Sequence, residues 1–247
     1  MEKHELPNKD MTTFVVAHGA WSAGWAWKKM HALLDVGGDR LFTPTYTGLG
    51  ERAHLAGPSN DLETHIQDVL GVLEYEDLRD VVLIGHSYGG MVATGVADRA
   101  RDRIKHLVYL DAFVPIDGQS QSDLVPAERR ARMREDAEAR GDGWRVPPNP
   151  IPADTLPVDE AWIAPRRLPI SIACFEMPLR FRNGELTVPR SYIYCTRSAP
   201  GDVFRQFAER AQREGWGYYE IDASHSPHVT APEALARVLR QIASKSR

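Results

Sequence analysis

The chain is poor in cysteine, in long apolar runs and in net charge, and each shortage excludes a class of protein. Its two cysteines, Cys174 and Cys195, are too few for a disulfide framework and lack metal-ligand spacing, so we expect small buried apolar residues. No apolar run reaches the roughly 18 residues that a membrane-spanning helix needs. A formal net charge of −4 gives no electrostatic reason to expect nucleic acid or an anionic membrane as a partner.

Cofactor motifs are missing as well. The glycine-punctuated loop 47–52 has neither the G-x-G-x-x-G spacing of a dinucleotide site nor the Gly-Lys-Ser/Thr of a phosphate loop. This loop therefore predicts neither a dinucleotide site nor a phosphate loop, and we expect no bound metal. Residues 1–10 are polar and lack the apolar centre of a signal peptide, which favours a flexible leader on a cytoplasmic protein.

One stretch combines a buried strand with a reactive side chain. Residues 81–84 are all β-branched or aliphatic, which predicts a strand covered on both faces, and 91–100 is compatible with a helix. The turn 85–89 reads G-H-S-Y-G and fits the G-x-S-x-G pattern. Glycines beside a serine in a strained conformation let the strand and the helix approach each other. We predict that Ser87 is a nucleophile at the N-terminus of this helix.

Strands and helices alternate along most of the remaining chain. Further strands are predicted at 12–17, 40–46, 104–111, 190–196 and 217–221. This alternation predicts a mostly parallel sheet of about six strands flanked by helices, with right-handed crossovers. A chain of 247 residues, 43% of them hydrophobic, can bury one large core, so we expect a single domain over 1–247.

The alternation of strands and helices is interrupted between Asp111 and the strand at 190–196. Residues 112–188 hold a charged stretch with helix-forming composition at 129–140, a proline cluster at 147–157 and several large aromatic side chains. A segment of this length is not expected to be a plain loop in a compact domain. We expect a helical cap, inserted after the strand that ends at Asp111 and covering the catalytic edge of the sheet; a decoration remote from the site is the alternative.

A serine hydroxyl needs a base to take its proton and an acid to orient that base. The loop after the last predicted strand carries His225 and His228, and we favour His225 because it lies nearer the strand end. For the acid we favour Asp111, since a carboxylate directly after an apolar strand is costly unless it has a partner. Asp202 is the reserve.

The negative charge that develops on an ester carbonyl under attack needs two donors. The residue after the nucleophile supplies one, the N–H of Tyr88, and we expect the N–H of Ala20, after the strand at 12–17, to supply the other. Candidate substrate-binding side chains are the polar or aromatic residues near this strand end and in the cap. They are His18, Trp21, Trp144 and Trp162.

With these residues in place, the chain resembles the α/β-hydrolases. It is similar to the branch that contains plant methyl-ester hydrolases, hydroxynitrile lyases and related bacterial esterases. The resemblance is carried by 18–21 (H-G-A-W), 85–90, 107–115 and the late His225. It implies a serine-histidine-acid triad, a backbone oxyanion hole and no cofactor.

Two residues depart from the pattern of this branch. Plant members carry an aspartate at about the position of Ser198, which is why we place the acid at Asp111. Similar hydroxynitrile lyases have a lysine directly after the catalytic histidine, where this chain has Ser226. The charge that would stabilise cyanide is therefore missing.

We predict a carboxylic-ester hydrolase that acts on small hydrophobic or aromatic esters through an acyl-enzyme. The alternatives on the same site are lactone, amide or carbamate hydrolysis and hydroxynitrile-lyase-like chemistry. A ligand-binding protein without catalysis, built on the same scaffold, is a third hypothesis. The expected partner is a small-molecule ester, and a homodimer is left open.

Overall fold

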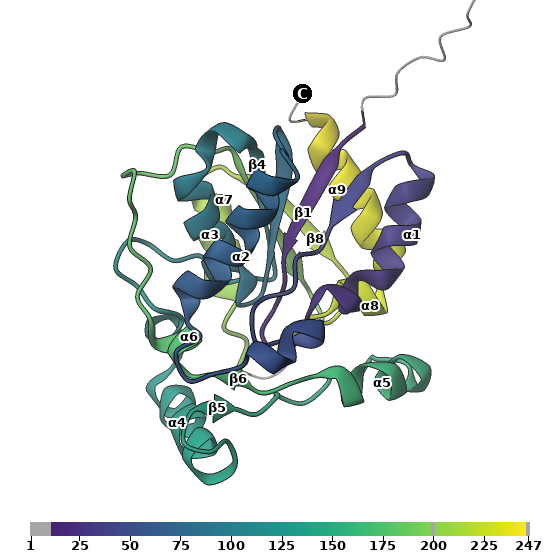
Figure 1. Cartoon of the computed structure of the whole chain (residues 1–247). Helices are drawn as coiled ribbons and strands as arrows, with labels where there is room; N and C mark the ends of the chain where they lie inside the picture. Colours follow the sequence, from purple (N-terminus) through teal and green to yellow (C-terminus); the bar gives the residue numbers. More distant parts are fainter. Residues whose placement is uncertain (1–10, 199–200, 246–247) are drawn as a thin grey trace, which may run out of the picture.

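Six parallel strands form one sheet at the centre of the computed structural model, which describes residues 11–198 and 201–245. In chain order the strands are β1 (Thr13–Ala17), β2 (Arg40–Phe42), β3 (Val81–His86), β4 (Ile104–Leu110), β7 (Arg190–Cys195) and β8 (Gly217–Ile221). Their spatial order is β2-β1-β3-β4-β7-β8, and Figure 1 shows the sheet between two layers of helices. The predicted parallel sheet is confirmed, while the leader expected at 1–10 lies outside the described residues.

Each face of the sheet is covered by its own helices. On one face lie α1 (Lys28–Val36), α8 (Pro227–Thr230) and α9 (Pro232–Lys245); on the other lie α2 (Leu62–Tyr75), α3 (Gly89–Arg99) and α7 (Arg205–Arg213) (Figure 1). Side chains alternate along the strands, so Val15 and Leu83 pack on the α2/α3 side and Val16 and Ile84 on the α1/α9 side. Both faces are buried, which explains the continuous apolar runs in the sequence.

Some predicted boundaries differ from the structure. The strand expected at 40–46 ends at Phe42, because Pro44 has no N–H for the ladder and β1 pairs only with Arg40–Phe42. The helix expected at 91–100 begins two residues earlier, at Gly89. Short 3₁₀ helices occur at η1 (Gly24–Trp27), η2 (Gly50–Leu55), η3 (Arg101–Arg103), η4 (Gln121–Leu124) and η5 (Ala164–Arg166).

The segment 112–188, here called the cap, lies across the ends of the strands, at the bottom of Figure 1. It contains α4 (Ala127–Arg140), β5 (Arg145–Val146), α5 (Pro157–Ile163), β6 (Ile170–Ser171) and α6 (Ala173–Glu176). β5 and β6 pair antiparallel, and at two residues each they are too short to leave a periodic signal in the sequence. Within the described ranges, no helix has the length and apolar character needed to cross a bilayer.

Candidate active site

The strand order reverses at β1, which lies between β2 and β3, and open parallel sheets bind ligands at such a reversal. Ser87 directly follows β3 and has a φ of 56°, a left-handed conformation that is strained for a serine. The two glycines around it allow close packing: a Cβ on Gly89 would lie 2.0 Å from the carbonyl oxygen of Ala17, and one on Gly85 would lie 2.8 Å from Cβ of Ala93. The turn therefore holds the serine at the edge of the sheet.

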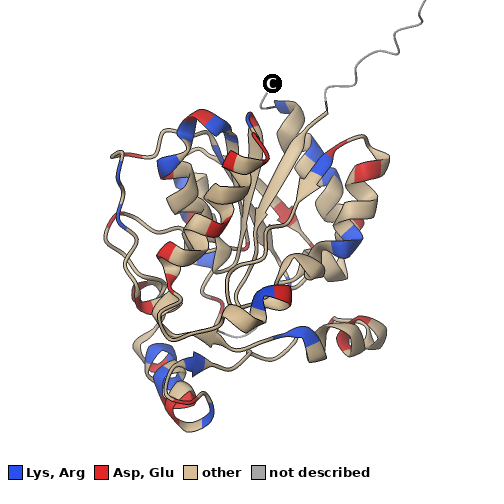
Figure 2. Ribbon diagram, in the orientation of Figure 1, with Lys and Arg blue, Asp and Glu red and all other residues tan. Residues whose placement is uncertain are grey.

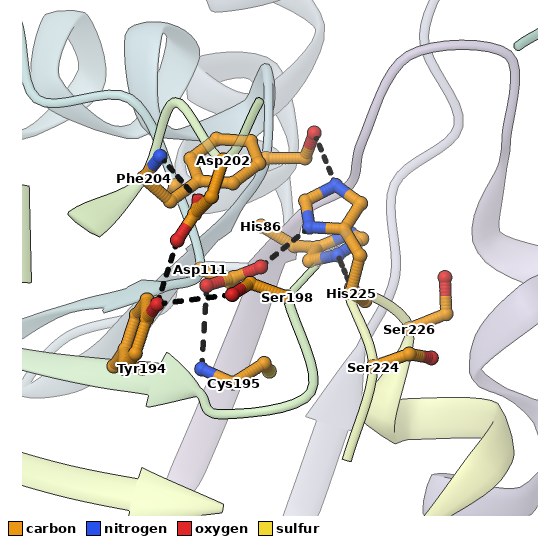
Figure 3. A network of polar contacts seen from close by, with 12 residues as sticks. His86, Asp111, Tyr194, Cys195, Ser198, Asp202, Phe204, Ser224, His225 and Ser226 are labelled. Carbon is orange, nitrogen blue, oxygen red and sulfur yellow. Dashed lines mark hydrogen bonds and ion pairs between the residues drawn. The ribbon is translucent and has the colours of Figure 1, made fainter. Parts of the chain in front are cut away.

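Three side chains from distant parts of the chain meet at this edge. The Oγ atom of Ser87 lies 2.9 Å from Nε2 of His225, and Nδ1 of His225 lies 2.7 Å from Oδ2 of Asp111. Figure 3 shows the imidazole of His225 beside the carboxylate of Asp111. Because a carboxylate only accepts hydrogen bonds, Nδ1–H donates to it and Nε2 is left to accept from the hydroxyl. This arrangement can move a proton from serine to imidazole.

The structure separates the two candidate acids. Asp111 is 4% exposed, follows β4 with a φ of 43°, and its Oδ1 accepts a hydrogen bond from the N–H of Cys195 at 3.3 Å. Asp202 accepts instead from the hydroxyl of Tyr194 at 2.6 Å and from the N–H of Phe204 at 2.8 Å (Figure 3). It lines the same cavity. The imidazole of His225 thus contacts Asp111 and not Asp202.

His86 lies inside the serine motif and makes a contact that the sequence did not predict. Its Nε2–H donates to the carbonyl oxygen of His225 at 2.7 Å, so the nucleophile turn and the loop of the base are directly connected (Figure 3). Burial, with His228 and His225 nearby, holds the pKa of His86 well below its ordinary value. His228, the other candidate base, stacks on Trp27 with ring centroids 4.7 Å apart. Burial lowers the pKa of His228 to about 3.

Two backbone N–H groups are available next to Ser87. Ala20 and Tyr88 line the cavity, and neither N–H donates to a backbone carbonyl of the residues that the structure describes. Tyr88 directly precedes α3, where helical N–H groups have no carbonyl to bond. Both groups are therefore placed to meet a negatively charged oxygen.

Of the four expected substrate-binding side chains, only Trp21 lines the cavity, and its indole N–H donates to the carbonyl of Val146 at 2.9 Å. His18 is fully buried: its ring bonds to the carbonyl of Gly19 and to the N–H of Tyr46, so it shapes the loop instead. Trp162 faces a separate surface hollow, because α5 turns its neighbour Ile163 toward the cavity.

Trp144 is also not part of the cavity wall. Its ring lies under the guanidinium of Arg145, 5.2 Å from centroid to Cζ, in the cap. Neither Trp144 nor Trp162 lines the cavity, so the geometry gives no support to their expected contact with substrate, which stays a prediction. The side of the cap that a tryptophan faces depends on how the short cap elements pack.

The cavity above Ser87 has a volume of about 690 Å³, which is typical of small-molecule sites. The ring of Phe204 stacks on that of His225, with centroids 4.7 Å apart. Several further wall residues were not among the expected substrate contacts, because the sequence does not show which way the side chains of the cap and the loops face. They are Phe113, Gln121, Arg129, Asn149, Asp154, Arg167, Phe175, Phe204 and Val229.

The described residues include no group of side chains that could bind a metal ion. Across 11–198 and 201–245, no three histidine, cysteine or acidic side chains gather closely enough to hold an ion. Both cysteines are buried, and burial raises the pKa of both thiols above their ordinary value, so neither thiol is ionised at neutral pH.

Comparison with known proteins gives a consistent result. Residues 14–238 match the family model described as "Alpha/beta hydrolase family". The chain is 42% identical over 242 residues to the "Carbendazim hydrolyzing esterase" of Nocardioides sp. (strain SG-4G), covering 93% of this chain and 98% of that protein. It is 25% identical to the "Pyrethroid hydrolase" of Sphingobium wenxiniae, covering 94% and 88% of the two chains.

Among solved structures, the chain is similar to an extracellular alpha/beta-hydrolase from a Paenibacillus species. The TM-score is 0.82, the sequence identity is 26%, and the match covers 93% of this chain and 98% of the other. That protein is described as sharing structural and functional homology with tobacco salicylic acid binding protein 2.

Proposed function

Since this chain belongs to the alpha/beta hydrolase family and is a carboxylic-ester hydrolase, we propose that Ser87, His225 and Asp111 are its catalytic triad. One observation carries the proposal, the unbroken hydrogen-bonded chain from Oγ of Ser87 through the imidazole to Asp111, at 2.9 and 2.7 Å. A serine, an imidazole and a carboxylate in this order form the group that activates serine for acyl transfer.

In the first half of the reaction, Oγ of Ser87 attacks the ester carbonyl while Nε2 of His225 takes the hydroxyl proton. The carboxylate of Asp111 holds the tautomer with a proton on Nδ1 and stabilises the imidazolium that forms. The N–H groups of Ala20 and Tyr88 meet the negative oxygen of the tetrahedral intermediate. Collapse passes the proton from Nε2 to the leaving alcohol and leaves an acyl-serine.

Water completes the cycle by the same route. His225 takes a proton from the water that attacks the acyl-serine, and then returns it to Oγ as the carboxylic acid leaves. The strained backbone at Ser87 keeps Oγ at the edge of the cavity throughout both halves.

The cavity wall favours small hydrophobic or aromatic substrates. Trp21 and Phe175 lie with ring centroids 5.7 Å apart on one wall, and Phe113 and Phe204 at 5.0 Å on another. Apolar and aromatic lining with a few polar groups is usual for sites that bind such molecules.

Carbamate hydrolysis is the second candidate, favoured by the 42% identical esterase named for carbendazim. Carbendazim carries a methyl carbamate on a benzimidazole ring. Attack at a carbamate carbonyl needs the same nucleophile, base and oxyanion donors as attack at an ester. Hydroxynitrile-lyase-like chemistry is disfavoured because Ser226 stands where similar lyases have a lysine.

The test is turnover of 4-nitrophenyl butyrate, with an expected burst of one phenolate per active site. Ser87→Ala should lower kcat by about 10⁵-fold or more, and a fluorophosphonate should no longer label the protein. Ser226→Ala, a serine that lines the same cavity, should keep most activity. Turnover and labelling that survive Ser87→Ala would end the proposal.

The cytoplasmic location expected from the sequence stays a prediction. Whether the protein forms a homodimer stays open. Size-exclusion chromatography with light scattering at several protein concentrations would answer the second.

A further inference from the structure

Four buried aromatic rings connect the two loops that carry the proposed oxyanion donors. His18 follows β1, Tyr46 lies in the loop after β2, His65 is in α2, and Tyr88 follows the nucleophile. Each of the four is at most 1% exposed. The ring of Tyr46 lies between the two imidazoles, with centroids 3.8 Å from that of His18 and 4.5 Å from that of His65. The mechanism above gives these four side chains, here called the ring cluster, no role.

Hydrogen bonds fix the tautomer of His65 within the ring cluster. Its Nε2 lies 3.3 Å from the carbonyl oxygen of Thr47, which can only accept, so Nε2 carries the proton. Nδ1 is then an acceptor, and the hydroxyl of Tyr88 donates to it at 3.1 Å. Burial lowers the pKa of His65 to about 3, so Nδ1 stays an acceptor at neutral pH. The thiol of Cys174 lies 3.9 Å from Nε2 and is a weak partner.

His18 holds the peptide group that carries the first donor. Its Nδ1–H donates to the carbonyl oxygen of Gly19 at 2.9 Å, and its Nε2 accepts from the N–H of Tyr46 at 3.3 Å. The hydroxyl of Tyr46 donates in turn to the carbonyl oxygen of His18 at 3.0 Å. In a trans peptide the C=O and N–H groups point in opposite directions. The bond to Gly19 therefore directs the N–H of Ala20 away from His18.

The peptide group that carries the second donor is held at both ends. The carbonyl oxygen of Ser87 accepts from the N–H groups of Gly90 at 3.0 Å and of Phe113 at 3.2 Å. At the other end, the side chain of Tyr88 is tied to His65. A strained conformation such as that of Ser87 persists only where the surroundings fix it strongly. The bond to His65 is thus one of the contacts that set the direction of the Tyr88 N–H.

We propose that His65 is a positioning residue of the oxyanion hole, which anchors the hydroxyl of Tyr88 and, through Tyr46, keeps this donor aligned with Ala20. The inference rests on the proposed function and adds how its two donors are held. Loss of the imidazole would leave a buried hydroxyl without its strong acceptor, so Tyr88 would move toward another partner. The effect should be greatest where the substrate oxygen carries negative charge, which is in the transition state.

The first experiment compares two substitutions of His65 in the full chain. His65→Leu should lower kcat for 4-nitrophenyl butyrate by about 10- to 50-fold, with KM within about twofold of the wild type, because it weakens a contact made in the transition state. His65→Asn places a carboxamide oxygen near the position of Nδ1 and should restore kcat to within about threefold of the wild type. Equal losses of kcat in the two variants would assign His65 to packing.

Tyr88→Phe removes the same hydrogen bond with almost no change of shape, so it tests the inference even if His65→Leu folds poorly. It should lower kcat by a similar factor, and the double variant should lose little more, because both changes remove one interaction. The matched control is His106→Leu. His106 is also buried and bonds to the hydroxyl of Ser191 at 2.8 Å, but it lies outside the cavity lining. This control should lose stability and keep kcat.

The second experiment uses benzylacetone and its trifluoromethyl ketone analogue as inhibitors. Oγ of Ser87 adds to the carbonyl carbon of the fluorinated ketone, the π electron pair moves to the oxygen, and His225 takes the hydroxyl proton. The adduct therefore places a negative oxygen between the donors, whereas benzylacetone stays a neutral ketone. In His65→Leu and Tyr88→Phe, Ki of the fluorinated ketone should rise by the factor by which kcat falls, with Ki of benzylacetone unchanged. Equal changes in both Ki values would overturn the inference.

Failure of the proposed function is distinguishable from failure of this inference. A wild type that neither hydrolyses the ester nor prefers the fluorinated ketone has no working oxyanion hole, and the proposed function is lost. A wild type that does both, with kcat within about twofold in His65→Leu and Tyr88→Phe, loses only the role of His65. A loss of kcat in His65→Leu that is absent from Tyr88→Phe would also overturn that role.

Discussion

The sheet and the cap use their polar side chains in opposite ways. At the edge of the sheet, Ser87 and Asp111 each follow a buried strand, and both have strained backbone conformations with φ values of 56° and 43°. In the cap, the longest helix, α4, buries only Ala137 and is covered in charged residues, as Figure 2 shows. Ser87 and Asp111 thus lie at rigid strand ends, whereas the cap side chains that line the cavity belong to a segment whose longest helix buries a single residue.

Replacing each of the two candidate acids by asparagine is the most direct test of this difference between the sheet and the cap. Asp111→Asn should lower kcat by about 10⁴-fold, because an amide at this position favours the wrong tautomer of the imidazole. Asn tolerates the left-handed backbone, so the fold should survive. Asp202→Asn should cost less than about tenfold, since it only weakens the bond to Tyr194. The reverse pattern in kcat would place the acid on the loop and not at the strand end.

The loss of stability at acid pH should come from buried histidines outside the cap, because the cap contains no histidine. Burial lowers the pKa of His18 to about 4 and that of His65 and His228 to about 3. In the unfolded chain these groups titrate near 6.5. Between about pH 6.5 and these values the unfolded state binds more protons, so the free energy of unfolding falls as the pH falls, by ~1.4 kcal/mol per pH unit per histidine.

Urea unfolding midpoints at pH 7.5, 6.0 and 5.0 measure this effect. The steepest loss should lie below pH 6.5, and His65→Gln should reduce the slope by about one proton even if it lowers stability at every pH. A free energy of unfolding that stays level or rises from pH 6.5 to 5 would contradict the burial of these neutral imidazoles.

His86 offers a sharper test of how the strand end positions the base. His86→Leu removes the hydrogen bond to the carbonyl of His225 and should lower kcat by about 10- to 100-fold with KM nearly unchanged, because a small displacement of the base is costly. His86→Gln keeps an N–H donor of similar reach and should recover most of kcat. Equal losses in both variants, or a rise in KM alone, would assign His86 to packing.

The smallest expected effect concerns the aromatic wall. Trp21→Ala should raise KM for phenyl acetate by about tenfold, since it removes an aromatic ring that lines the cavity and the hydrogen bond to the carbonyl of Val146. Trp144→Ala, in the cap but outside the cavity, should change KM by less than about twofold. A larger effect at Trp144 would mean that the cap, and not the sheet edge, forms the main ligand wall.

The parallel sheet could be predicted because its strands are buried on both faces and therefore read as uninterrupted apolar runs. The sequence predicted that Ser87 and His225 lie close together, because Ser87 lies in a strand-turn-helix motif and His225 follows the last strand. Parallel strands bring their carboxyl ends to one edge, so residues 138 positions apart along the chain become neighbours.

The choice between Asp111 and Asp202 depended on distances that no local pattern encodes. Both carboxylates line the cavity, and only the packing of the loop after β7, with Tyr194 bonded to Asp202, directs one of them away from the imidazole. The direction of side chains in the cap was even harder to predict from the sequence. Its elements are short, so the direction of Trp162, Trp144 and Gln121 follows from contacts between segments and not from periodicity.

The amino-acid order alone thus determined the alternation of strands and helices, the sharp turn at Ser87 and the presence of a base at the end of the last strand, because each depends on residues close together in the chain. The tertiary structure decided which carboxylate contacts the imidazole of His225 and which aromatic rings line the cavity. These last features depend on long-range packing, in which small shifts of a weakly buried segment change which side chain faces inward.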